Sequence, residues 1–168
     1  MLRTTLLADR GDMDTTSEGE SFVPRAFIPP TSLVTEQFRL EPLGPEHNEA
    51  DLAAWTSSIE HIRATPGYPD GSWPPLDGMS LDRNLRDMHR HADDFTARRG
   101  FTFTVLDPRS GDVIGCLYLY PSPDRDHDVL AQSWVRADRA HLDGPLVDAV
   151  RRWIRRDWPW KRVDYPGR

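Results

Sequence analysis

Hydrophobic and polar positions repeat with two different periods along this chain, and the changes of period divide it into elements. Over residues 35–43, apolar and polar side chains alternate, which predicts a β-strand that a Gly-Pro pair at 44–45 ends. From Asn48, expected to be an N-cap, apolar residues recur every three or four positions up to Pro66, so a helix is predicted. Its apolar stripe consists of Leu52, Trp55, Ile59 and Ile62.

A second helix is predicted after a proline-rich loop at residues 66–79. Ser80 is its expected N-cap, and Gly100 follows its last turn as a stop signal. The apolar positions at helical spacing are Leu81, Leu85, Met88, Ala92 and Phe95.

The period returns to two after Gly100, and the remaining elements follow in quick succession. They are a β-hairpin at 101–105 and 113–120, a strand at 129–135, a helix at 142–157 and a short strand at 163–165. The predicted order is therefore β-α-α-β-β-β-α-β, an α+β (mixed α/β) fold. Its sheet is mixed and mostly antiparallel, because only the late strand–helix–strand unit requires a parallel pair.

The beginning of the chain has a different composition. Residues 1–32 are rich in Gly, Ser, Thr, Asp and Glu and predict a disordered leader before one domain at 33–168, while Phe22 to Pro30 predict an extended arm lying on that domain. The start lacks a long apolar segment, and no apolar run approaches the roughly 20 residues of a membrane span. We therefore expect no membrane association and a cytoplasmic location.

Composition and charge narrow the classes of function. The net charge of −6 argues against a nucleic-acid partner, which usually requires a basic excess. The basic segment 151–156 is typical of a solvated helix face. Cys116 is the only cysteine, which excludes an intramolecular disulfide, and His89 and His91 lie two apart and so face different directions on a helix. We expect no metal site.

Three stretches combine these elements into a familiar arrangement: the strand TEQFRLEPL at 35–43, the hairpin from FTFTV to DVIGCLY at 101–118, and SWVRADR at 133–139 running into LVDAV at 146–150. Over about residues 34–165 they resemble the GNAT family of N-acyltransferases. The resemblance implies acetyl-CoA as co-substrate and a small-molecule amine as acceptor. In that family two parallel strands diverge, the pantetheine arm lies between them, and the pyrophosphate binds the next loop, at a helix N-terminus.

The chain departs from the family at that loop, which reads DRAHLDGP over 138–145. Gly144 is its single glycine, Pro145 has no N–H to donate, and Asp143, a good N-cap, places a carboxylate where phosphate would bind. The C-terminal part of the family fold is also missing after residue 168. Arginine and histidine side chains upstream could replace the lost donors. The implied coenzyme-binding residues are Trp134, Val135, Arg136, Arg139, His141 and Gly144.

The resemblance also places the chemistry on the strand at 129–135. The candidate catalytic residues there and on the last strand are Ser133, Gln132 and Tyr165, the latter being the one late tyrosine. The acceptor would lie against the first two helices and the hairpin. The candidate substrate-binding residues are Glu60, His61, Arg63, Trp73, Tyr118 and Tyr120. The alternative is that the helix residues simply face solvent and that the tyrosines pack against neighbouring side chains of the sheet.

Two functions follow from these observations. The retained strand–helix unit favours an acyl-CoA-dependent N-acetyltransferase with a modified coenzyme site. The degenerate loop favours a GNAT-derived module without transferase activity, which would bind a ligand or form a dimer. An open last strand makes a homodimer the expected assembly.

Overall fold

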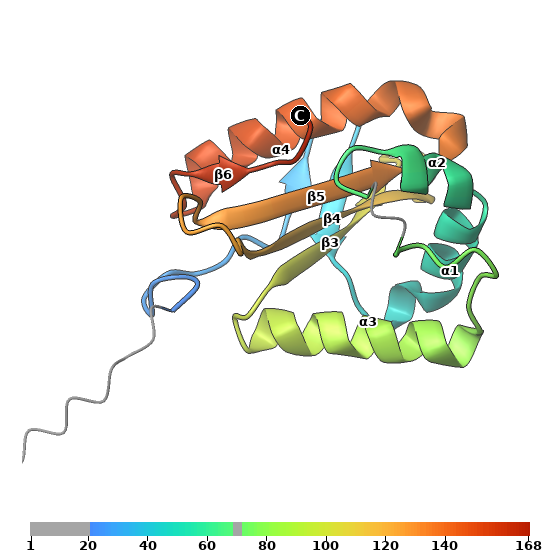
Figure 1. Cartoon of the computed structure of the whole chain (residues 1–168), viewed down its shortest axis with the longest axis horizontal. Coiled ribbons are helices and arrows are strands. Elements are labelled where there is room, and N and C mark those ends of the chain that lie inside the picture. Colours follow the sequence, from blue (N-terminus) through green and yellow to red (C-terminus); the bar gives the residue numbers. More distant parts are fainter. Residues whose placement is uncertain (1–20, 69–71) are drawn as a thin grey trace, which may run out of the picture.

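The computed structural model describes residues 21–68 and 72–168, and within them one mixed sheet forms the centre of the molecule. The strands, in spatial order, are β1 (Leu33–Val34), β2 (Arg39–Pro42), β3 (Phe101–Leu106), β4 (Val113–Pro121), β5 (Val129–Val135) and β6 (Val163–Asp164). The helices are α1 (Asn48–Thr56), α2 (Ile59–Ala64), α3 (Leu81–Thr96) and α4 (Asp143–Asp157), with 3-10 turns at Pro45–His47 and Ala137–Leu142. Helix α4 covers one face and α1 and α3 the other (Figure 1). Only the β5–β6 pair is parallel, so the predicted α+β class is confirmed.

The first strand was predicted over residues 35–43, but the observed strand β2 covers only Arg39–Pro42. The chain forms a turn at residues 35–38, where the alternating pattern begins. Thr35 Oγ1 accepts hydrogen bonds from the backbone N–H groups of Gln37 (3.2 Å) and Phe38 (2.9 Å). A threonine side chain that takes up backbone donors in this way favours a turn over a continued strand. The turn folds β1 back against β2 as a small antiparallel hairpin.

The predicted helix after residue 44 is interrupted, and its predicted cap is wrong. Asn48 is the first residue of α1 and His47 its N-cap, because the Asn48 amide donates instead to the Leu81 carbonyl at 3.2 Å. At the end of α1, the Thr56 hydroxyl donates to the Leu52 carbonyl at 2.6 Å, and Ser58 has left helical geometry with φ −137°. Hydroxyl side chains compete with backbone donors here, which accounts for the break before α2.

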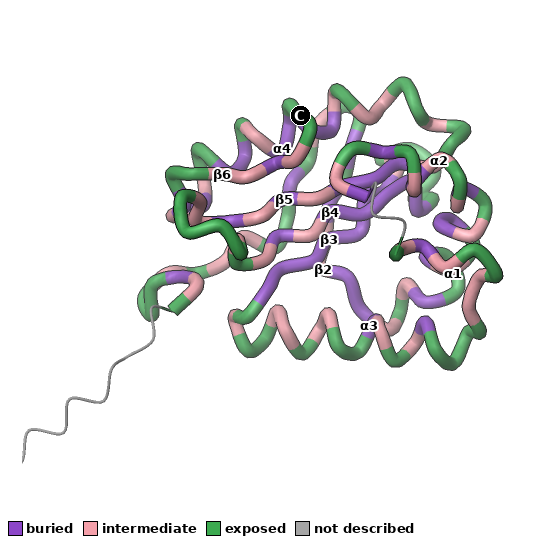
Figure 2. The backbone as a smooth tube through the Cα atoms, viewed as in Figure 1, coloured by how far each residue is buried: buried purple, intermediate pink, exposed green. Residues whose placement is uncertain are grey.

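The sheet is buried on both faces, as Figure 2 shows for β3, β4 and β5. On the α4 side, Phe101 and Phe103 pack against Trp153 and Trp158 with ring centroids 5.0–6.2 Å apart. On the other side, β4 and β5 contribute Cys116 and Trp134 to a second core with α1 and α3. Since alternate residues of one strand enter different cores, each position of β4 and β5 has a definite side.

The segment at 21–30 lies on the domain, while residues 1–20 of the predicted leader lie outside the described part of the chain. Val23 is completely buried, and the Phe22 ring stacks on Trp160 at a centroid distance of 4.6 Å. The Arg98 guanidinium donates to the carbonyls of Pro24 (2.7 Å) and Phe27 (2.8 Å). These contacts attach the arm to the end of α3 and to the strand β3 beneath it.

Strand β6 pairs over both of its residues with the beginning of β5. The Asp128 carboxylate accepts from the backbone N–H groups of Lys161 (2.9 Å) and Arg162 (2.8 Å) and from the Arg162 guanidinium, which lowers the pKa of Asp128 to about 2. The strand register then pairs Val129 with Val163 and Leu130 with Asp164 and stops there. Strand β6 ends at Asp164, and residues 131–135 of β5 continue beyond it without a parallel partner (Figure 1). With both of its residues paired, β6 is too short to show the divergence that the family resemblance implied.

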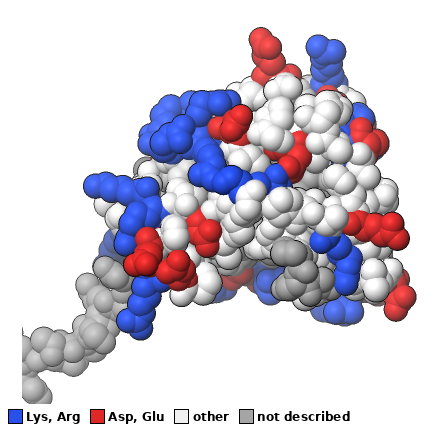
Figure 3. Space-filling model, turned by 45° about the horizontal axis from the view of Figure 1, so that its top comes forward, with Lys and Arg blue, Asp and Glu red and all other residues white. Residues whose placement is uncertain are grey.

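Charged side chains are mixed over the surface, with basic groups gathered on the left of the view in Figure 3. In the basic segment predicted to be a solvated face of α4, Arg152, Arg155 and Arg156 are exposed. Over residues 21–68 and 72–168, no helix is long and apolar enough to cross a membrane.

Candidate functional site

The unpaired part of β5 is bridged to the end of the chain by side chains. Ser133 is fully buried and points to the α4 side, where its Oγ lies 2.5 Å from the hydroxyl oxygen of Tyr165. Burial raises the pKa of Tyr165 to about 12, so its hydroxyl stays protonated at neutral pH. Beyond the end of β6, a hydrogen bond between two of the predicted catalytic residues therefore links β5 to the segment that follows β6.

The N-terminus of α4 holds an ion pair where the resemblance places pyrophosphate. Asp143 is the first residue of α4 rather than its N-cap, because Leu142 takes that position and makes no side-chain cap. The Asp143 carboxylate accepts from the Arg168 guanidinium, with Nη2 at 3.0 Å, while Arg151 donates to the Arg168 carbonyl at 2.8 Å. A Cβ added at Gly144 would meet nothing within 4 Å, so no narrow cradle requires glycine there.

The other predicted coenzyme-binding residues lie around the end of β5, where Arg139 and His141 line a shallow surface pocket together with Glu36 and Asp107. Arg136 donates to the Asp138 carboxylate at 3.0 Å through Nε, and Arg139 lies 3.8 Å from the Asp107 carboxylate. His141 is exposed, and Trp134 and Val135 are fully buried on opposite faces of the sheet. The arginines are thus already paired with carboxylates.

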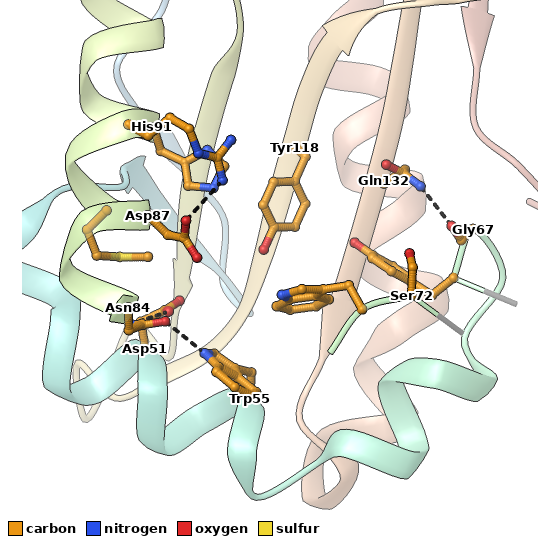
Figure 4. A pocket seen from close by; sticks show the side chains of 13 residues that line it. Asp51, Trp55, Gly67, Ser72, Asn84, Asp87, His91, Tyr118 and Gln132 are labelled. Carbon is orange, nitrogen blue, oxygen red and sulfur yellow. Dashed lines mark hydrogen bonds and ion pairs between the residues drawn. The ribbon is translucent and has the colours of Figure 1, made fainter. Parts of the chain in front are cut away.

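A cavity of about 340 Å³ opens on the other face of the sheet, between α1, α3 and the ends of β4 and β5 (Figure 4). Tyr118 and Gln132 are direct partners in the β4–β5 register, so both side chains reach this face. Gln132 Nε2 donates to the Gly67 carbonyl at 2.7 Å and thereby fixes the start of the loop after α2. The lining residues are Asp51, Trp55, Gly67, Tyr68, Ser72, Trp73, Asn84, Asp87, Met88, Arg90, His91, Tyr118 and Gln132.

Aromatic rings form one wall of the cavity around Trp73. The centroid of Trp73 lies 5.8 Å from those of Trp55 and Tyr68 and 6.3 Å from that of Tyr118. The interplanar angles of these contacts are 43–74°, so the rings are tilted or edge-on to one another rather than stacked. Trp73 and Tyr118 are the partly exposed rings among them, whereas Trp55 and Tyr68 are buried.

Acidic and amide side chains form the opposite wall. Asp51 is 3% exposed and accepts from Asn84 Nδ2 at 3.2 Å, and its burial raises its pKa to about 6. Asp87 faces the same space and pairs with Arg90 at 3.4 Å (Figure 4). A carboxyl group whose pKa lies this close to neutrality can take up or release a proton, which is a property frequent in functional sites.

His91 is oriented by a short chain of hydrogen bonds behind the cavity. The Tyr120 hydroxyl donates to the Asp94 carboxylate at 3.0 Å. His91 Nδ1 lies 3.0 Å from both the Tyr120 hydroxyl oxygen and Thr102 Oγ1, and these two contacts fix the orientation of the ring. Burial lowers the pKa of His91 to about 4, and the ring is neutral at physiological pH.

The structure divides the predicted site residues between the two faces of the sheet. Gln132, Trp73 and Tyr118 line the cavity. Ser133 and Tyr165 lie on the α4 side, so the three predicted catalytic residues do not share one site. The alternation of side chains along β5 is the reason, because neighbouring residues of a strand face opposite sides.

The remaining predicted substrate-binding residues support the cavity or lie outside it. Tyr120 orients His91, and the Arg63 guanidinium donates to the Pro74 carbonyl at 2.7 Å, next to Trp73. Glu60 is exposed, and neither it nor His61 lines the cavity.

Sequence reasoning missed the polar wall of the cavity. Asn84, Asp87 and His91 recur at intervals of three and four beside the apolar stripe of α3, and Asp51 takes the same place on α1. Polar residues adjoining an apolar stripe at helical spacing are the signal that could have found them.

Comparison with solved structures finds the same fold in known acetyltransferases. The ribosomal-protein-S5-alanine acetyltransferase from Vibrio fischeri gives a TM-score of 0.58 at 12% identity, over 74% of this chain and 67% of that one. A probable GNAT-family acetyltransferase from Chromobacterium violaceum gives 0.57 at 13% identity, over 95% and 74%. The microcin C7 self-immunity acetyltransferase, solved with acetyl-CoA and AMP, gives 0.56 at 10% identity, over 76% and 66%.

No family model and no curated protein sequence matches the chain. At these identities the structural likeness defines the fold and not the activity. The chain has the GNAT fold, as its order of elements predicted.

Proposed function

We propose that this chain transfers an acyl group from an acyl thioester such as acetyl-CoA to an amine held in the cavity at α1 and α3. The observation that carries the proposal is the end of β5–β6 pairing after Leu130, beside a cavity that Gln132 of the same strand lines. An unpaired strand edge can receive an extended amide-bearing chain, as in strand addition. The solved relatives that hold acetyl-CoA or coenzyme A support the donor class.

The chemistry follows from the groups on the two sides of β5. When bound, the thioester supplies an electrophilic carbonyl carbon. The amine nitrogen attacks that carbon, a C–N bond forms, and the C–S bond breaks with its electron pair leaving on sulfur. The bound ammonium ion must first lose one proton, because only the neutral amine has the lone pair that attacks. Asp51 is placed to take this proton and pass it to solvent, because a base of pKa about 6 is ionised at neutral pH. The second proton leaves the nitrogen after the C–N bond has formed and neutralises the thiolate.

The pyrophosphate end of coenzyme A fits this chain less well than the thioester end. Asp143 would repel phosphate at the α4 N-terminus, and Pro145 offers no N–H there. The guanidinium group of Arg168 lies at the α4 N-terminus, but it donates hydrogen bonds to the Asp143 carboxylate. The proposed donor site therefore rests on the β5 edge, and we derive no contact to the nucleotide.

The test is acyl transfer by the full chain with acetyl-CoA and a panel of amines, followed by thiol release and by mass spectrometry of the products. We expect thiol release that depends on an amine and a thermal shift with acetyl-CoA, since a ligand at 100 times its Kd stabilises by about 2.7 kcal/mol. Asp51→Asn should lower the rate at least about tenfold, in the range of lost general-base catalysis, while Glu60→Gln, on the exposed side of α2, should not.

The competing function is a GNAT-derived binding or dimeric module without transferase activity. Amine-independent thiol levels across the panel, together with no thermal shift at millimolar acetyl-CoA, would overturn the transferase proposal in favour of that module.

A further inference from the structure

The shape of the cavity is suited to a ligand with one flat face. Trp55, Tyr68 and Tyr118 surround the half-buried Trp73, and Trp134 lies behind it at a centroid distance of 6.1 Å. A volume of about 340 Å³ lies near the lower end of the range for small-molecule pockets, roughly 300–1,000 Å³. The space therefore fits a single small ring system and not a long chain.

The charge of the lining favours a cation. Among the described residues of the lining, Asp51 and Asp87 are the acidic groups, Arg90 is the cationic group, and His91 is neutral. The Arg90 side chain is 58% exposed, so it lies largely in solvent, whereas Asp51 is buried. A bound cation would be attracted both by the carboxylates and by the negative faces of the indole rings.

One hydroxyl group gives the cavity a further polar contact. The Tyr118 hydroxyl accepts from Trp134 Nε1 at 3.3 Å and bonds to the Cys116 thiol, so it is already engaged within the protein. Tyr68 is 7% exposed, and its hydroxyl has no hydrogen-bond partner among the described residues. A buried hydroxyl without a partner is costly, and a ligand that bonds to it removes that cost.

We infer that the cavity binds a small primary amine carried on an aromatic ring, an arylalkylammonium ion. This inference specifies the acceptor class of the proposed function. The transfer of an acyl group to this amine rests on the proposed function, whereas the binding of the amine does not. The ring would lie against Trp73 and Trp55, and the ammonium group would lie on the side of Asp51 and Asp87. Acidic ligands are excluded by the same carboxylates, and long peptides by the volume.

The experiment is a binding titration of the full chain without any thioester, by calorimetry or by tryptophan fluorescence. The probes are 2-phenylethylamine, 2-phenylethanol, butylamine, phenylacetate and a short peptide with a free N-terminus. We expect 2-phenylethylamine to bind at least about tenfold more tightly than the neutral alcohol and the aliphatic amine, a difference typical of a desolvated cation–π contact.

Two variants locate the site without relying on a single side chain. Asp87→Asn, at a partly exposed carboxylate, should weaken the amine about fivefold to tenfold and leave the alcohol unchanged, because only the charge is removed. Trp73→Ala should weaken both aromatic probes, and Glu60→Gln should change neither. Equal affinity for phenylacetate, preference for the peptide or butylamine, or no binding of any probe at about 10 mM would overturn the inference.

The binding and transfer experiments fail separately. Amine binding without acyl transfer would leave the cavity assignment standing and overturn the proposed function. Transfer to aliphatic or peptide amines without aromatic preference would leave the function standing and overturn the acceptor class.

Discussion

At the scale of single residues, one predicted N-cap is confirmed and two are wrong, because Asn48 and Asp143 are each the first residue of a helix and not its cap. Ser80 was predicted to begin a helix, and its hydroxyl accepts from Arg83 N–H at 3.2 Å, because a cap depends only on residues three positions away. The bond between Ser133 and Tyr165 and the burial of Asp51 depend on segments far apart in the chain. They required the structure.

Asp51 makes the stability of the fold depend on pH. Its pKa is about 6 in the folded chain and 3.8 ordinarily, so between these values the folded state binds more protons than the unfolded state. The contribution of Asp51 to the free energy of unfolding should therefore be largest below pH 4. It should fall by up to about 3 kcal/mol as the pH rises through 6. Denaturant titrations at pH 4, 5, 6 and 7 measure this change.

Asp51→Asn should remove that fall, because asparagine has no charge to desolvate. Asp148→Asn, on the exposed face of α4, is the matched control and should keep the pH dependence of the parent chain. The interpretation is wrong if the two variants give the same curve.

The bond between Tyr165 and Ser133 should oppose opening of the β5 edge. Tyr165→Phe leaves the buried Ser133 hydroxyl without this partner and should lower the free energy of unfolding by about 1–2 kcal/mol. Within the proposed function, it should also lower the acetyl-CoA concentration needed for half-maximal transfer. The double change Ser133→Ala with Tyr165→Phe should recover part of the stability, because neither polar group is then left buried. An unchanged dependence on acetyl-CoA would mean that the bond does not gate the strand edge.

At the scale of elements, periodicity predicted the middle of the fold better than its beginning. The hairpin β3–β4 and strand β5 follow their alternating patterns, since each face of these strands enters a different core. The strand near residue 35 and the helix near residue 57 were predicted too long. In both places hydroxyl side chains form hydrogen bonds with nearby backbone groups and interrupt the regular element. The spacing of apolar residues carries no information about these bonds.

Gly115 illustrates a close approach between two strands. A Cβ at this position of β4 would lie 2.3 Å from the Trp134 carbonyl oxygen, which belongs to the backbone of β5 and cannot rotate away. Gly115→Ala should therefore destabilise the fold by about 1–3 kcal/mol or more. Gly144→Ala is the control, because its Cβ would meet nothing within 4 Å. Thermal denaturation compares the two, and equal melting temperatures would contradict the structure.

At the scale of the whole molecule, the fold class could be predicted from the order of elements, but the cavity could not. Its walls come from α1, the loop after α2, α3, β4 and β5, and only packing brings them together. The prediction named Gln132 and Ser133 together because the family resemblance places the chemistry on their strand. In a sheet with a core on each face, sequence neighbours belong to different sites.

The arm at 21–30 should contribute to global stability. Phe22 stacks on Trp160, and its carbonyl accepts from Trp160 Nε1 at 2.9 Å. Phe22→Ala should lower the free energy of unfolding by about 1–3 kcal/mol, less than a fully buried phenylalanine, since Phe22 is only half-buried. Ile28→Ala, at a side chain that is 86% exposed, is the control and should have little effect in the same denaturant titration.

The ion pair of Asp143 with Arg168 has a consequence for the choice of donor within the proposed function. A carboxylate already neutralises the guanidinium that would otherwise attract the ADP portion of coenzyme A, so that half of the molecule should add little affinity. Acetyl-pantetheine, which lacks ADP entirely, should then serve almost as well as acetyl-CoA, with KM values within about threefold. Short acyl thioesters would then serve as donors at concentrations similar to those of acetyl-CoA.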